Sequence, residues 1–140
     1  MSAFGYLLLL PSDLASSDIA AAAAALAADI SESRIQLDIV AHGDDPRDST
    51  LANRTLEELG RLPRKIIADA RLDNPATVQE FYDDHIAPAL IQGQSVVLLV
   101  RASVTDALRN LIDPNPADTT LGRPELFRFD RELQPIRFRP

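Results

Sequence analysis

Two histidines stand where an imidazole could accept a phosphoryl group or bind a metal ion. His42 lies in AHGDDP and is followed by Asp44 and Asp45, so the stretch could form a metal site or place a phosphoacceptor at a strand end. Neighbouring loop residues rarely converge on one ion, and a solvated loop explains the same residues. His85 lies in a helical stretch, where packing or a favourable charge near the helix C-terminus competes with catalysis.

Two arginines are candidates for binding phosphate, because a planar guanidinium group can donate two parallel hydrogen bonds to phosphate oxygens. Arg109 belongs to a helical stretch, and Arg123 follows the turn-rich loop NPADTTLG that starts at Asn115. Each arginine could equally pair with a neighbouring aspartate at the surface. Tyr82 is a further candidate for ligand contact, and its position on the apolar face of a helix fits the core as well.

Composition and charge indicate a single cytoplasmic domain. The chain has 140 residues, 46% of them hydrophobic, and its formal net charge is −7. This charge disfavours nucleic acid and anionic membranes as partners. The absence of cysteine excludes disulfides and thiolate metal sites. The apolar start MSAFGYLLLLPSD lacks the basic residues of a signal peptide, and the arginine-rich end of the chain could meet an acidic partner or a phosphate.

Strand and helix patterns alternate along the chain, which predicts an α/β sandwich with helices covering a sheet. We expect one domain over residues 1–140, with an irregular tail at 131–140. Strands are predicted at residues 5–10, 34–43, 65–72, 95–100 and 125–130. Helices are predicted at residues 17–30, 49–59, 75–86 and 103–113, and Asp48 or Ser49 is expected to cap the second of them.

Three stretches in order along the second half resemble the nucleoside diphosphate kinase family: EFYDDH, GQSVVLLV and LRNLIDPNPADTTLGRPE. The resemblance implies a ferredoxin-like βαββαβ core, a homo-oligomer, a Mg-nucleotide ligand, and ligand-binding roles for Tyr82, Arg109, Asn115 and Arg123. Two registers fit the first half. Either residues 43–73 are inserted into the family core, or that core begins near residue 36 and residues 1–33 are an N-terminal extension with an extra strand and helix. The second register needs no large insertion.

The chain departs from this family at groups that its phosphoryl transfer needs. The family's lysine is replaced by Pro11 or Ala41, depending on the register, and no nucleophilic histidine of an "HGSD" motif follows Phe127. The resemblance therefore implies a catalytically degenerate pseudoenzyme that binds a nucleotide or phosphorylated small molecule, or serves as an assembly or regulatory module. The alternatives are an active nucleotide phosphotransferase using His42 or His85, and a pure protein-interaction module. No metal site of the protein's own is expected.

Overall fold

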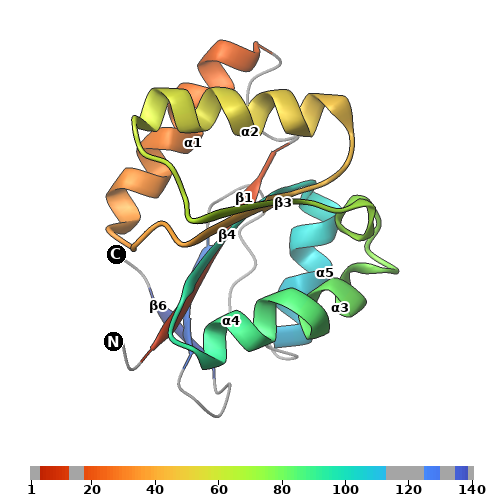
Figure 1. Cartoon of the computed structure of the whole chain (residues 1–140). Helices are drawn as coiled ribbons and strands as arrows, with labels where there is room; N and C mark the ends of the chain where they lie inside the picture. Colours follow the sequence, from red (N-terminus) through yellow and green to blue (C-terminus); the bar gives the residue numbers. More distant parts are fainter. Residues whose placement is uncertain (1–3, 13–17, 113–124, 130–134, 139–140) are drawn as a thin grey trace.

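The computed structural model describes residues 4–12, 18–112, 125–129 and 135–138, which form one sheet with helices on both faces (Figure 1). The strands are β1 (Gly5–Pro11), β2 (Ile39–His42), β3 (Lys65–Ala68), β4 (Ser95–Val100), β5 (Glu125–Phe129) and β6 (Pro135–Phe138). The α-helices are α1 (Ile19–Ser33), α2 (Pro46–Leu59), α3 (Val78–Phe81), α4 (Ala87–Ile91) and α5 (Ala102–Ile112). A 3-10 helix, η1 (Ala70–Asp73), follows β3, and a π-helix, η2 (Tyr82–Ile86), joins α3 to α4. None of the described helices is long and apolar enough to cross a membrane.

The sheet has the strand order β3-β2-β4-β1-β5-β6. Within the part of the sheet formed by β1 to β4, all neighbouring strands are parallel. Strand β5 runs antiparallel to β1, and β6 runs antiparallel to β5. Parallel neighbours require a crossover, and a helix supplies one between each pair of successive strands from β1 to β4. The prediction of an α/β sandwich is therefore confirmed.

The predicted ferredoxin-like βαββαβ core is wrong. Such a core contains two strands that follow one another without a helix between them. Here α2 separates β2 from β3, and the two strands pair in parallel. Strand β1, which falls in the segment 1–33 predicted as an extension, lies inside the sheet between β4 and β5. The segment 131–140, predicted to be irregular, contains the short strand β6.

Alternate side chains of β1 face two separate hydrophobic cores, one on each side of the sheet. Leu8 and Leu10 pack with residues of α1 and α2. Leu7 and Leu9 pack on the other face with residues of α3, η2, α4 and α5. Figure 1 shows the two helical layers above and below the sheet. A strand buried on both faces explains the continuous apolar run that begins this sequence.

Helix α2 begins earlier than predicted, and this shift determines what its first turn contains. Its N-cap is Asp45, whose side chain accepts a hydrogen bond from the backbone N–H of Arg47 at 2.9 Å. We predicted the cap at Asp48 or Ser49. Pro46 follows the cap at a position where proline suits a helix start, because no intrahelical N–H is lost there. Asp48 consequently lies within the first turn and points towards the strand ends described below.

Candidate functional site

The carboxyl ends of β1 and β4 are the point in the sheet where the chain changes direction. From β1 the chain passes through α1 to β2 on one side, and from β4 it passes through α5 to β5 on the other side. In open α/β sheets, ligands bind in the crevice outside such a switch point, because the diverging connections leave the strand ends uncovered. The side chains at these two strand ends are therefore the first candidates for a functional site.

Six polar side chains gather here, and we call them the strand-end cluster: Ser12, Asp45, Arg47, Asp48, Asp73 and Arg101. Ser12 follows β1 directly and is fully buried. Its N–H donates to the carbonyl oxygen of Val100 at 2.7 Å, which fixes it against β4. Its hydroxyl group donates to Asp48 Oδ1 over a long distance of 3.5 Å. A hydroxyl and a carboxyl group thus meet where the two central strands end.

Burial raises the pKa of Asp48 above the ordinary value of an aspartate, and the neighbouring carboxylates of Asp45 and Asp73 raise it further. The guanidinium groups of Arg101 and Arg47 act in the opposite direction without cancelling this effect. The side chain is 4% exposed. Asp48 therefore keeps its proton to a higher pH than an exposed aspartate does, so it can donate that proton to a bound group.

The two arginines of the cluster come from different parts of the chain, and both are at least partly exposed to solvent. Arg47, in the first turn of α2, donates from Nη1 to the carbonyl oxygen of Ser12 at 3.3 Å. Arg101, directly after β4, pairs through Nη2 with Asp45 Oδ2 at 3.3 Å. The side chains of that pair are 47% and 38% exposed, and exposed ion pairs contribute little stability. An anion can therefore compete for Arg101 at small cost.

Gly43 allows two carboxyl groups of the cluster to approach the end of β2. A Cβ atom at this position would lie 1.9 Å from Asp73 Oδ1 and 2.9 Å from Asp48 Oδ2, closer than side chains tolerate. Asp73 Oδ2 accepts from the N–H of Asp44 at 3.0 Å. Asp73 Oδ1 is buried and has no hydrogen-bond partner among the described residues. An unpaired buried carboxylate oxygen favours a hydrogen-bond donor from a ligand.

The structure places His42 at the carboxyl end of β2, where it is 5% exposed. Its Nδ1 lies 2.7 Å from the carbonyl oxygen of Gly43. Because a carbonyl group only accepts, Nδ1 is the donor of this hydrogen bond. Of the two aspartates predicted beside it, Asp44 donates its backbone N–H to Asp73, and the side chain of Asp45 accepts from the backbone N–H of Arg47 at the start of α2. No three such side chains in the described ranges are placed to hold a metal ion.

His85 and Tyr82 both belong to the π-helix η2, away from the strand-end cluster. The ring of His85 packs on Phe81 with 4.8 Å between ring centroids. Tyr82 packs against the core that includes residues of α3 and α5. Burial raises the pKa of Tyr82, and the negative charge of Asp83 raises it further. The catalytic role considered for His85 and the ligand contact considered for Tyr82 stay predictions. Tyr82 packs against the core, whereas His85 is only partly buried.

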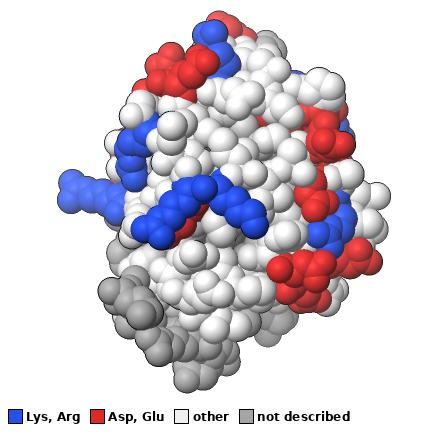
Figure 2. Space-filling view, in the orientation of Figure 1, with Lys and Arg blue, Asp and Glu red and all other residues white. Residues whose placement is uncertain are grey.

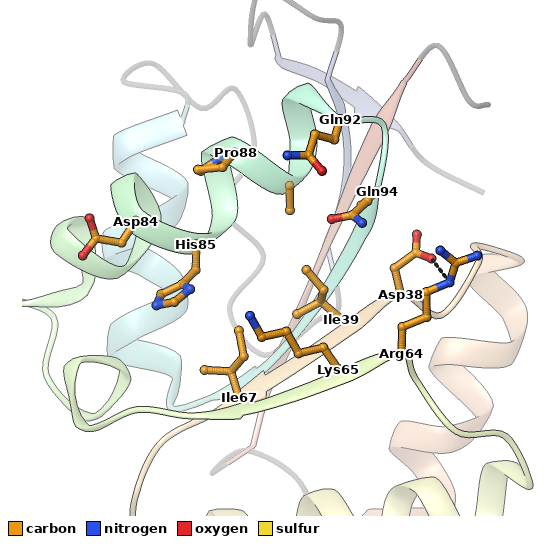
Figure 3. A pocket seen from close by; sticks show the side chains of 11 residues that line it. Asp38, Ile39, Arg64, Lys65, Ile67, Asp84, His85, Pro88, Gln92 and Gln94 are labelled. Atoms are coloured by element: carbon orange, nitrogen blue, oxygen red, sulfur yellow. Dashed lines mark ion pairs between the residues drawn. The ribbon is translucent and has the colours of Figure 1, made fainter.

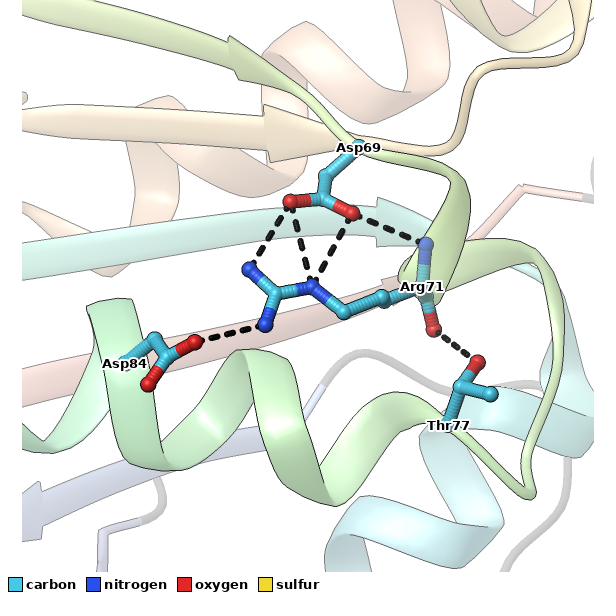
Figure 4. A network of polar contacts seen from close by, with 4 residues as sticks. All are labelled: Asp69, Arg71, Thr77 and Asp84. Carbon is cyan, nitrogen blue, oxygen red and sulfur yellow. Dashed lines mark hydrogen bonds and ion pairs between the residues drawn. The ribbon is translucent and has the colours of Figure 1, made fainter.

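Arg71 fastens η1 to η2 beside the end of β3 (Figure 4). Its guanidinium group pairs with Asp69 Oδ2 at 3.0 Å and with Asp84 Oδ2 at 2.6 Å. It also lies 5.6 Å above the ring of Phe81. The hydrogen bonds from Arg71 lower the pKa of Asp69. With three partners this arginine has a structural role at the junction of the two short helices.

Arg109 is buried on α5 and holds two carboxylates. Its Nη1 donates to Asp106 at 2.7 Å, and its Nε lies 2.6 Å from Glu125 Oε1 of β5, as an ion pair without the alignment of a hydrogen bond. The side chain is 5% exposed. Its predicted phosphate-binding role stays a prediction, and its observed neighbours are acids. Asn115 and Arg123, the other predicted ligand residues, lie outside the described residues.

Comparison with known proteins identifies the fold. No family model matches the chain, and neither does any curated protein. Among solved structures, phosphoglycerate mutase from Plasmodium falciparum matches with a TM-score of 0.72 at 11% identity, covering 99% of this chain and 91% of that one. A mycobacterial glucosyl-3-phosphoglycerate phosphatase in complex with VO3 matches with a TM-score of 0.60 at 13% identity, covering 99% and 97%. A candidate phosphohistidine phosphatase from Agrobacterium tumefaciens matches with a TM-score of 0.58 at 14% identity, covering 100% and 99%.

These similarities show that the chain shares the fold of these three solved structures. They overturn the resemblance to nucleoside diphosphate kinases, and with it the interpretation as a degenerate nucleotide kinase or pseudoenzyme and its two alternatives. The strand order given above is the structural reason, because a central parallel sheet with β1 inside it does not fit the kinase core.

Sequence reasoning missed the strand-end cluster, although a signal for it was present. Ser12 and Arg101 each follow a strongly apolar strand directly, and the ends of adjacent parallel strands meet at one edge of a sheet. What was missing was the strand order, which alone shows that β1 and β4 are neighbours. From the sequence, Asp48 is considered only as a helix cap, and Arg47 is not singled out.

Proposed function

We propose that the protein hydrolyses phosphomonoesters at the strand-end cluster. The observation that carries the proposal is the convergence of two arginines, a buried hydroxyl group and an aspartate with a raised pKa on the switch point between β1 and β4. The names of the structural neighbours support the substrate class. They are a phosphoglycerate mutase, a glucosyl-3-phosphoglycerate phosphatase and a candidate phosphohistidine phosphatase, and each name describes chemistry on a phosphoryl group.

In this proposal Arg47 and Arg101 bind the non-bridging phosphoryl oxygens. Guanidinium groups suit this task because their fork matches phosphate geometry. Arg101 exchanges its exposed partner Asp45 for the substrate, and Arg47 already points at the carbonyl oxygen of Ser12. The hydroxyl group of Ser12 donates a further hydrogen bond to the phosphoryl group when it leaves its long contact with Asp48. Together these donors offset the charge that builds on the phosphoryl oxygens during transfer.

Asp48 acts as the proton carrier in the proposed hydrolysis. Water forms a bond from its oxygen to phosphorus, the ester P–O bond breaks, and the leaving alcohol takes the proton of Asp48. The attacking water returns a proton to Asp48, and hydrogen phosphate leaves. The raised pKa suits this role, because the acid must be protonated when the substrate binds. An ionised Asp48 would also repel the substrate, so activity is expected to fall as pH rises through the pKa of this group.

The proposal is tested by phosphate release from a panel of phosphomonoesters that includes p-nitrophenyl phosphate and 3-phosphoglycerate, with and without vanadate. We expect release that vanadate inhibits and that Arg101→Gln and Arg47→Gln each reduce about tenfold or more in kcat/KM, since one charged hydrogen bond contributes about 1.5–3 kcal/mol. Arg54→Gln is the matched control, because Arg54 is an exposed arginine on the same helix as Arg47.

Two results would remove the proposal. One is the absence of phosphate release from the whole panel together with the absence of vanadate binding. The other is release that persists at the wild-type rate when both cluster arginines are replaced. In the second case the activity would belong to another site or to a contaminant.

A further inference from the structure

A cavity of about 390 Å³ lies at the opposite end of the sheet from the strand-end cluster. It is bounded by the amino ends of β2 and β3 on one side and by η2 and α4 on the other (Figure 3). Its volume falls in the range that small organic ligands occupy. Ile39 and Ile67 form an apolar wall, and Pro88 faces them from α4. The polar side chains around this wall determine what could bind.

Several charged groups of the cavity already have partners within the protein. Asp38 is buried, accepts from the backbone N–H of Ser95 at 2.9 Å and pairs with Arg64 at 3.7 Å. Asp84 pairs with Arg71 and points away from the cavity in Figure 3. The acidic groups of the lining are thus each bound to a donor.

Unlike the acidic groups of the lining, Lys65 and His85 point into the cavity, where they face each other from β3 and η2 (Figure 3). No ion pair in the described part of the chain involves the ammonium group of Lys65 or the ring of His85, although a positive charge on His85 adds to the effect of Arg71 in lowering the pKa of Asp69. Figure 2 shows basic side chains gathered near the middle of the view, although the chain as a whole has a net charge of −7. Gln92 and Gln94 add two amide groups at the other end of the cavity.

We propose that this cavity binds a small organic carboxylate with an apolar body. The carboxylate group lies between Lys65 and His85, where an ammonium group and a ring N–H can both donate to it. The apolar body packs on Ile39 and Ile67, and a polar group at its far end accepts or donates a hydrogen bond to the amides of Gln92 and Gln94. The site does not depend on the phosphomonoester chemistry, because it shares no residue with the strand-end cluster.

Lys65 is the only lysine of the chain, which makes a direct test of this site practicable. Reductive methylation with ¹³C-formaldehyde labels two amines, Lys65 and the N-terminus, and keeps their charge. Their NMR signals are assigned by pH titration, because a lysine titrates about two units above an α-amino group. The probe is 4-hydroxybenzoate, which carries a carboxylate and a hydroxyl group at opposite ends of a ring. Its uncharged analogue 4-hydroxybenzamide and inorganic phosphate are titrated in parallel.

We expect the Lys65 signal to shift and saturate with 4-hydroxybenzoate while the N-terminal signal stays in place. The benzamide and phosphate should give no saturating shift. His85→Phe keeps the aromatic contact with Phe81 and removes the ring N–H, so it should weaken the apparent Kd about tenfold. Arg54→Gln, an exposed change on α2 at the other face of the sheet, should leave the Kd unchanged.

Any of four results would overturn the proposal. The first is that the Lys65 signal shows no saturating shift up to about 10 mM probe, a concentration at which even a weak site would respond. The second and third are an equal shift with the benzamide and an equal shift with phosphate. The fourth is an unchanged Kd in His85→Phe. Failure here would leave phosphate release at the strand-end cluster unaffected, so the two proposals are tested separately.

Discussion

The ion pair between Arg109 and Glu125 gives a prediction that separates a structural role from a ligand-binding one. Arg109 Nε lies 2.6 Å from Glu125 Oε1, and the two side chains are 5% and 13% exposed. The pair joins α5 to β5, two elements that are distant in sequence. Arg109→Met keeps an unbranched apolar chain of similar length and removes the charge, so it isolates the contribution of the guanidinium group.

The size of the effect follows from burial. Removing one partner of a buried pair costs about 3–5 kcal/mol, because the other charge remains in a poorly solvated place. The second pair of Arg109, with Asp106, adds little because that carboxylate is 38% exposed. We therefore expect Arg109→Met to lower the free energy of unfolding by about 3 kcal/mol, which corresponds to about 10 °C in Tm for a domain of this size.

Urea denaturation followed by circular dichroism measures this change, and a double-mutant cycle with Glu125→Gln identifies its source. The double variant should be more stable than the sum of the two single changes predicts, by about 2 kcal/mol. The reasoning is refuted if Arg109→Met costs less than about 1 kcal/mol, the value of an exposed pair. If stability is unchanged and affinity for a phosphorylated ligand is lost, the ligand-binding role predicted from the sequence is correct instead.

Three further predictions concern the packing and charge of the described residues. Asp48→Asn should stabilise the protein at neutral pH. Because the pKa of Asp48 is raised in the folded state, the wild type has its full stability below the ordinary aspartate pKa and loses part of it as pH rises through the folded-state pKa. The urea midpoint of the variant should therefore exceed that of the wild type at pH 7 and match it near pH 3. Gly5→Ala should cost about 1–3 kcal/mol in urea denaturation, because the new Cβ would lie 2.6 Å from the backbone oxygen of Leu90 on α4; a smaller cost would mean that α4 can move away from β1. Asp38→Ala should cost about 1–3 kcal/mol because the N–H of Ser95 loses its acceptor, whereas Asp38→Asn keeps an oxygen there and should cost less; equal costs would show that the hydrogen bond is unimportant.

Strands with a strong apolar pattern were predictable from the sequence, because a strand that is buried on both faces needs a continuous run of apolar residues. Residues 95–100 form β4 as predicted. The strand predicted within residues 34–43 is shorter than expected and begins only at Ile39, because its extent is set by pairing with β4 and β3 and not by its own alternation. The helix predicted over 75–86 is divided into α3 and η2, and it continues past the predicted end as α4, which has Pro88 near its start.

The family resemblance failed because its matching pieces carry little topological information. EFYDDH is a helical stretch and SVVLLV an apolar strand, and both occur in many α/β folds. The alternation of strands and helices from residue 5 onward was the better guide, since it predicts parallel strands joined by crossovers. The site could not be found without strand order, because Ser12, Asp48 and Arg101 come from three separate elements.

The most direct test of phosphoryl binding at the strand-end cluster is a crystal structure of the protein with VO3, the ligand named for one of its structural neighbours. We predict vanadate at the carboxyl ends of β1 and β4, within hydrogen-bonding distance of Arg47, Arg101 and the hydroxyl group of Ser12, with the ion pair between Arg101 and Asp45 opened. Vanadate bound elsewhere, or an empty cluster at saturating vanadate, would contradict the assignment of this site.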